Sequence, residues 1–221
     1  MSLPVLNTPT FELILPSTGE PVKYRPFLVK EHKVLMTMAE ADDSEVARIV
    51  LELVNTCTFN TLNVKRLPHF DIEYIFLQLR AKSISETVDV IVTCDCGNKI
   101  ETTFNIDNLI VENSSNHTNK IMLTETYGVE MGYPPFKEVV DVFASSETTK
   151  IIDLIINSIL GVFDESNYWS MKDQPIEEIE NFVYSLTKEQ FDRIEEFFVT
   201  APRVVQVIER SEEHTSELQS H

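Results

Sequence analysis

The sequence has few glycines and no long apolar run. Among 221 residues there are 5 glycines, and no hydrophobic stretch approaches the roughly 20 residues that a membrane span requires. No glycine-rich phosphate loop, G-x-S-x-G or H-E-x-x-H pattern occurs. A basic segment followed by an apolar one, as in a secretory signal, is also absent from the start. We therefore expect a soluble protein that folds in the cytoplasm, has no membrane span and has no catalytic site.

Basic residues are scarce as well. The chain holds 18 lysines and arginines against 36 aspartates and glutamates, a formal net charge of −18. Such a surface repels nucleic acid and anionic lipid, which are bound through basic patches. Nucleic-acid binding is therefore not expected. Acidity of this size fits a protein that meets a basic partner, but it equally serves solubility, so the charge names no partner.

Cysteine is rare, with 3 in the chain, and an odd number without a secretory signal indicates reduced thiols rather than disulfides. Cys94 and Cys96 stand in the turn of a predicted hairpin, which is how zinc ribbons present thiolate ligands. A closed zinc site needs four ligands, and Cys57, His69 and His117 show no matching spacing. The pair is either a zinc half-site or two reduced thiols at a β-turn, and both interpretations stay open.

No other residues have the spacing of a chemical site. His32, His69 and His117 stand on three separate segments, which is typical of surface or capping histidines. No two carboxylates are held at a fixed separation across a cleft, as glycoside cleavage requires. The last predicted helices have acidic faces, which by default are solvated and otherwise would dock a partner. The residues of these faces are Glu177, Glu178, Glu180, Asp192, Glu195 and Glu196.

The strongest structural signal is a helix within residues 67–83. Four large apolar residues recur at i, i+3, i+4 and i+7 and so share one helical stripe: Ile72, Ile75, Phe76 and Leu79. Tyr74 and Leu77 widen the apolar surface, so this helix is expected to contact the core on more than one side. The polar residues left for its rim are Glu73, Gln78, Arg80 and Lys82. We predict that other elements wrap this helix and that it joins two halves of the chain.

The remaining patterns predict an α+β fold in three regions. Residues 1–84 combine an N-terminal β-hairpin with helices; the strands are expected at 11–15 and 22–27, and two further helices at 29–41 and 44–55. Residues 85–134 form a β-rich insertion with two hairpins, whose strands are expected at 87–93, 99–106, 120–124 and 128–133. Residues 135–203 form a C-terminal helical region, with helices expected at 135–144, 147–160, 175–185 and 187–199 and a linker or edge segment at 164–172.

The end of the chain has a different origin on our interpretation. Residues 210–221 read as the translation of a widely used short-read sequencing adapter, so we exclude them from the fold. Removing their one arginine and three glutamates leaves 18 − 1 = 17 basic and 36 − 3 = 33 acidic residues, a net charge of −16. The natural chain is then cut near Glu209, within an extended-looking run over 203–208. A complete zinc site would need the missing segment to supply its other ligands.

Four blocks of the sequence carry a resemblance to a known family. They are LPSTGE at 15–20, YRPFLVKE at 24–31, the helix segment 67–83 with its ending Arg80-Ala-Lys-Ser83, and CDCG at 94–97; the helix segment is the specific one. Together they resemble the baseplate hub subunit, or baseplate hub assembly protein, family of T-even-like contractile-tailed bacteriophages.

The resemblance implies a non-enzymatic viral tail protein that contacts other phage baseplate hub proteins. It would act as a hub subunit or as an assembly chaperone, in the host cytoplasm during assembly and, as a subunit, in the tail baseplate of the virion. An acidic, zinc-stabilised adaptor module is the alternative, and a tail-associated cell-wall hydrolase is a remote one, because the residues lack a site. The sequence indicates neither the direct partner nor the oligomeric state.

Overall fold

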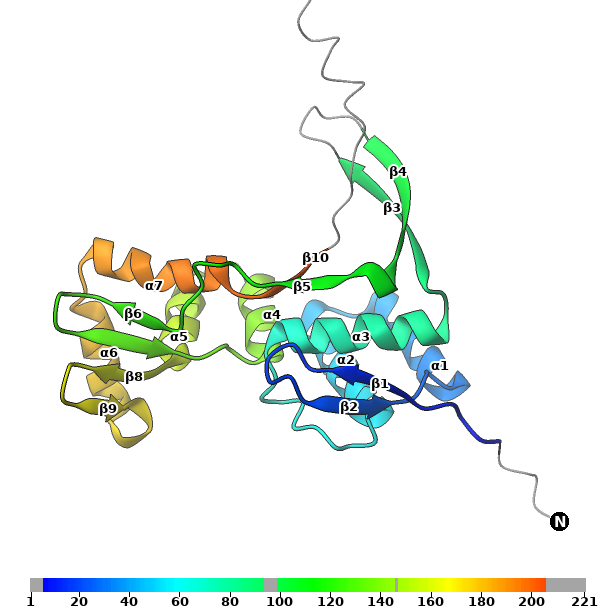
Figure 1. The fold of residues 1–221 in the computed structure, drawn as a ribbon, viewed down its shortest axis with the longest axis horizontal. Coiled ribbons are helices and arrows are strands. Elements are labelled where there is room, and N and C mark those ends of the chain that lie inside the picture. The colour runs from blue at the N-terminus through cyan, green and yellow to red at the C-terminus, as the bar shows by residue number, and fades with distance from the viewer. Residues whose placement is uncertain (1–5, 94–98, 146, 206–221) are drawn as a thin grey trace, which may run out of the picture.

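The computed structural model describes residues 6–93, 99–145 and 147–205 (Figure 1). Within these ranges the chain forms seven α-helices and ten strands, and the strands lie in small antiparallel sheets. The predicted α+β class is confirmed. No helix in the described ranges combines the length and the hydropathy needed to cross a membrane. The turn at 94–98, with Cys94 and Cys96, and the segment 206–221 lie outside the described residues.

The first half of the chain is built around one hairpin and three helices. Strands β1 (Phe11–Ile14) and β2 (Pro21–Tyr24) pair antiparallel, as predicted. Helix α1 (Val29–Thr37) continues into a 3₁₀ turn at Met38–Glu40, and α2 (Asp43–Cys57) and α3 (His69–Ser83) follow. Apolar side chains of β1, β2, α2 and α3 form the first hydrophobic core.

Helix α3 is the buried helix that the periodicity predicts. Ile72, Ile75 and Leu79 are fully buried, while Phe76 is partly buried at the edge of the same core. One rim assignment is wrong: Gln78 is 9% exposed and therefore buried. The reason is that α3 contacts neighbouring elements on more than one side, so a polar position next to the apolar stripe is also covered.

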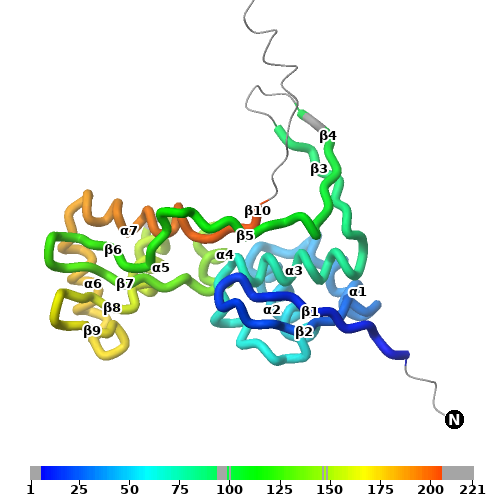
Figure 2. Tube along the Cα trace, viewed as in Figure 1, coloured from blue at the N-terminus to red at the C-terminus, as the bar shows by residue number. Residues whose placement is uncertain are grey.

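Strands β3 (Thr87–Thr93) and β4 (Lys99–Asn105) form a long two-stranded ribbon, called the arm below. They pair antiparallel from Thr87 opposite Asn105 to Thr93 opposite Lys99, which confirms the predicted hairpin strands. In Figure 2 the arm stands away from the rest of the described chain. A 3₁₀ turn at Ile106–Asn108 leads from its base into β5 (Ile110–Glu112), which pairs with β10 (Arg203–Val205) near the other end of the chain.

The second half combines one sheet with four helices. Strands β6 (Lys120–Met122), β7 (Gly128–Met131), β8 (Ile159–Phe163) and β9 (Tyr168–Ser170) form an antiparallel sheet in that order. The helices are α4 (Phe136–Ser145), α5 (Thr148–Ser158), α6 (Ile176–Tyr184) and α7 (Lys188–Thr200), and a 3₁₀ turn at Met171–Asp173 precedes α6. Side chains of the sheet, α5, α6 and α7 form the second core.

Strand β8 was not predicted, whereas β9 lies within the segment 164–172 that was expected to be a linker or an edge segment, and it is the edge strand of its sheet. The helix expected at 147–160 ends at Ser158, and the chain then turns into β8, which pairs with β7. The apolar run through residues 151–163 suits a buried helix and a buried strand equally. Its pattern therefore does not show at which residue the helix ends and the strand begins. As a result, the second core crosses the boundary at 134/135 that separates the β-rich and helical regions in the sequence-based division.

Candidate interaction surfaces

The residues considered for a metal or catalytic site do not come together in the described part of the chain. Cys94 and Cys96 lie outside the described residues, so the zinc half-site stays a prediction. Cys57 is fully buried in the first core, and burial raises the pKa of its thiol to about 11. Within the described ranges, no group of three or more histidine, cysteine, aspartate or glutamate side chains is placed to hold a metal ion.

His117 forms part of an aromatic junction that the sequence did not reveal. Its Nε2 lies 2.7 Å from the hydroxyl of Tyr133, and its Nδ1 lies 3.0 Å from Oγ1 of Thr200. The imidazole also contacts the ring of Phe197, at 5.0 Å between centroids. Burial lowers the pKa of His117. The residue thus joins the segment before β6 to the end of α7, which is a structural role.

The arm has two chemically different faces. Cross-strand pairs place Val88 opposite Phe104 and Val90 opposite Thr102 on one face. On the other face Asp89 stands opposite Thr103, whose Oγ1 donates a hydrogen bond of 2.6 Å to the Asp89 carboxylate. Further toward the tip, Ile91 and Val92 are 64% and 37% exposed. The arm is therefore an amphipathic ribbon with apolar side chains in partial contact with solvent.

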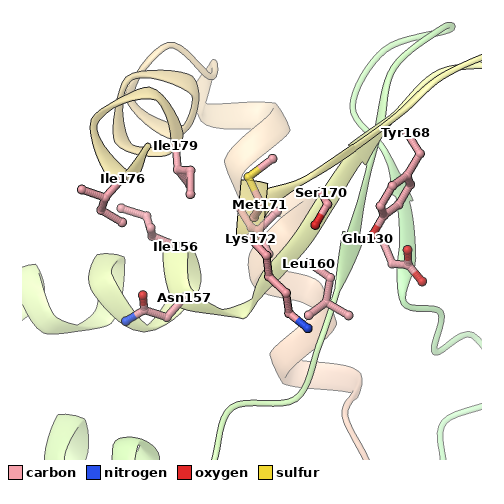
Figure 3. A pocket seen from close by; sticks show the side chains of 11 residues that line it. Glu130, Ile156, Asn157, Leu160, Tyr168, Ser170, Met171, Lys172, Ile176 and Ile179 are labelled. Carbon is pink, nitrogen blue, oxygen red and sulfur yellow. The ribbon is translucent and has the colours of Figure 1, made fainter. Parts of the chain in front are cut away.

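A hollow of about 430 Å³ lies between the end of α5, strand β9 and the start of α6 (Figure 3). Its apolar wall includes Ile156, Leu160 and Ile176, and its polar lining residues include Glu130 and Lys172. The lining holds one carboxylate and one lysine together with Ser170 and Tyr168, but neither histidine nor cysteine. The hollow therefore combines an apolar wall with a few polar side chains.

Tyr168 closes one side of this hollow. Its ring covers Gly161 of β8, where a Cβ atom would come within 2.4 Å of the ring. Burial and a hydrogen bond to the Glu130 carboxylate raise the pKa of Tyr168. Glycine is thus needed at position 161 for the tyrosine side chain to cross its neighbouring strand toward Glu130.

A second hollow, the aromatic groove, lies between the sheet and α6. It measures about 410 Å³ and is lined mainly by apolar side chains: Tyr127, Val162, Trp169, Met171, Ile179 and Phe182. The rings of Tyr127 and Trp169 lie 6.4 Å apart and are 48% and 39% exposed. Glu178 stands at the rim. The predicted acidic face of Glu177, Glu178 and Glu180 is exposed, as expected both for a solvated face and for a docking face.

Comparison with protein families matches residues 8–219 to the T4 bacteriophage base plate protein family. No curated protein and no solved structure matches the chain. The matched range includes residues 210–219, so the match does not distinguish the segment interpreted as an adapter translation from the rest of the chain. That interpretation stays a prediction. The match covers the hairpin, α3, the arm and the second core alike. The chain therefore belongs to the T4 bacteriophage base plate protein family.

Proposed function

We propose that this baseplate protein acts in the central hub, as a structural subunit or as an assembly chaperone, and that it works through protein–protein contacts without catalysis. Family membership supports a structural role among other baseplate proteins. Assembly takes place in the host cytoplasm, and a subunit would then remain in the tail of the virion. The arm is the feature that supports this proposal. It is a two-stranded ribbon with an apolar face that a partner protein could cover.

An isolated two-stranded hairpin is at best marginally stable in water, and sheets normally bury one face against a second layer. The arm extends from the base at Thr87 and Asn105 with a valine-rich face, while its other face is polar. A partner layered on Val88, Val90 and Phe104 would remove that apolar area from water. The arm therefore supplies the surface through which the protein joins the hub.

The proposal is tested by a pull-down from phage-infected cells, with purified mature virions probed in parallel. Capture of baseplate proteins together with presence in virions is expected for a hub subunit. Capture together with absence from virions is expected for a chaperone. If no tail protein is captured, the hub role is wrong.

A matched pair of variants tests whether the arm makes the contact. Val90→Lys places a charge on the apolar face, and Thr103→Lys places the same charge on the polar face of the neighbouring strand. We expect Val90→Lys to lose the captured hub proteins and Thr103→Lys to retain them. Equal capture by both variants would show that the contact lies elsewhere on the protein.

A further inference from the structure

We propose that the protein self-associates head to tail, with α1 of one copy docked in the aromatic groove of a second copy. This inference stands on the two surfaces themselves and does not depend on a place in the hub. It commits to a second copy because the chain carries both halves of a complementary contact. One half is the groove with its acidic surroundings, and the other is an exposed helix with apolar and basic side chains.

The groove has the character of a site for an apolar anchor. Its walls are the indole of Trp169, the phenol of Tyr127 and the side chains of Met171 and Phe182, and the last two pack against the second core. Aromatic walls attract both thioether sulfur and ammonium groups. A methionine flanked by lysine is therefore a suitable occupant of this hollow.

The segment of the chain that supplies most of the groove is rich in acidic residues. The segment 160–187, which supplies β8, β9 and α6, contains a single basic residue, Lys172. Its acidic residues are Asp164, Glu165, Asp173, Glu177, Glu178 and Glu180. Glu178 itself lines the groove. The local field thus favours a basic partner and disfavours an acidic one.

Helix α1 presents the opposite character. Val29, Lys33 and Met36 fall at i, i+4 and i+7 and so share one face, and Val29 and Met36 are 86% and 70% exposed. Lys30 adjoins this face; its side chain is 69% exposed, and its Nζ lies 3.4 Å from Oε1 of Glu31. The one buried residue of α1 is Glu31, which is directed inward to Arg25. The outward side of α1 is therefore apolar and basic.

Two other strongly exposed apolar residues on helices stand among acidic residues. Val199 on α7, 77% exposed, stands one turn after Glu195 and Glu196. Phe143 on α4, 81% exposed, lies between Asp141 and Glu147, which hold the nearby lysines in ion pairs. Charge complementarity thus selects the α1 face for the acidic groove.

The two surfaces lie at opposite ends of the molecule. In Figure 1, α1 is at one end of the long axis, and α6 and β9 are at the other. One copy therefore cannot satisfy its own groove, and each copy keeps a free surface after docking. Contacts of this heterologous kind close into a ring or extend into a filament.

Sedimentation of the purified chain over a range of concentrations tests the contact. We expect association that weakens as salt rises from about 50 mM to about 500 mM, because screening shortens the reach of the charges. Met36→Asp removes the anchor and Trp169→Ala removes the groove wall, and each should weaken association about tenfold or more, since desolvated anchors dominate contact energies. Val199→Asp, the same kind of change at another exposed site, should leave association unchanged.

The head-to-tail geometry makes a sharper test possible. A mixture of Met36→Asp and Trp169→Ala chains retains one intact helix and one intact groove, so it should form a one-to-one dimer and nothing larger. Glu178→Lys, at an exposed rim position, repeats the groove test without removing a packed ring. A monomeric wild-type chain, an equal loss in Val199→Asp, or a mixture that stays monomeric would each overturn the proposal. So would a groove that captures another baseplate protein while the chain itself does not associate.

Discussion

The ring of Phe70 meets the ring of Tyr133 edge to face, with centroids 5.1 Å apart and an interplanar angle of 89°. Phe70 lies at the start of α3 in the first half of the chain, and Tyr133 follows β7 in the second. Tyr133 in turn stacks on Phe197 of α7 at 5.3 Å. These contacts link the start of α3 to the second core through aromatic packing.

Phe70→Ala should lower the free energy of unfolding by about 3–5 kcal/mol, because Phe70 is 1% exposed and its removal leaves a cavity between the cores. Chemical denaturation measures the change. Tyr133→Phe is the control, since it keeps the ring contact and removes the hydrogen bond to His117, at a cost of about 1 kcal/mol. If Phe70→Ala costs no more than Tyr133→Phe, the aromatic contact does not hold the halves together.

Leu79→Ala tests the buried stripe of α3. Leu79 is fully buried, so truncation should cost about 2–5 kcal/mol of unfolding free energy. Ile84, just after the helix, is 54% exposed, and Ile84→Ala should change stability by less than about 0.5 kcal/mol. A small effect at Leu79 would place that face of the helix on the surface.

The buried ion pair of Arg25 and Glu31 makes stability depend on pH. Arg25 Nη2 donates to Oε1 of Glu31 at 2.9 Å, and the Leu28 amide donates to Oε2 at 2.8 Å. Burial acts to raise the pKa of Glu31, but these hydrogen bonds outweigh it and leave the pKa below the usual 4.5. The stabilisation is therefore present above pH 4.5 and is lost as pH falls through the lower, folded-state value.

Glu31→Ala should cost about 3–5 kcal/mol at neutral pH, because it leaves the Arg25 charge buried without its partner. In thermal unfolding at several pH values, the stability of Glu31→Ala should also fall less steeply with decreasing pH than that of the wild type. Glu45→Ala breaks an exposed pair with Arg48 of similar length, 2.7 Å, and should have a much smaller effect. Equal losses in the two variants would contradict the buried character of the first pair.

Asp71 has the opposite pH dependence. It is fully buried in α3, where burial raises the pKa of its carboxyl above 3.8 despite hydrogen bonds donated by the amide and hydroxyl of Ser17. Its contribution to stability is therefore present below pH 3.8 and is lost as pH rises through the raised folded-state value. Asp71→Asn removes this titration, so its stability relative to the wild type should improve as pH rises above 3.8. A difference independent of pH would show that folding does not raise the pKa of this carboxyl.

The zinc half-site interpretation of Cys94 and Cys96 leads to a direct measurement. If the two thiols ligate zinc, metal analysis of the purified chain should show bound zinc that is lost in Cys94→Ser and Cys96→Ser. Cys57→Ser is the control, because Cys57 is buried in the first core. Zinc that persists in both the Cys94→Ser and the Cys96→Ser variants would leave the interpretation of two reduced thiols.

Much of the local structure follows from short-range pattern. Alternation predicts the strands of the arm, and apolar residues at helical spacing predict α2 and α3, because each pattern depends on neighbours within two to four positions. The start of α2 differs from the predicted one by a single residue: the helix begins at Asp43, and the side chain of Asp42 caps it by accepting a hydrogen bond from the Glu45 amide. The candidate surfaces were less predictable, since exposure of Met36 or Trp169 depends on what the rest of the chain leaves uncovered.

The sequence by itself determined the α+β class, the buried α3 helix and the strands of the arm, since periodicity decides which face of an element avoids water. Tertiary structure alone decided that the helix ends at Ser158 and that the residues after it form β8, which pairs with β7. It also decided that Val204 of β10 stands opposite Val111 of β5. It also decided that Glu31, an ordinary polar residue in the sequence, is buried against Arg25. Strand partners and buried charges depend on segments distant in the chain, and their pairing is set by the free energy of the whole packed fold rather than by any local pattern.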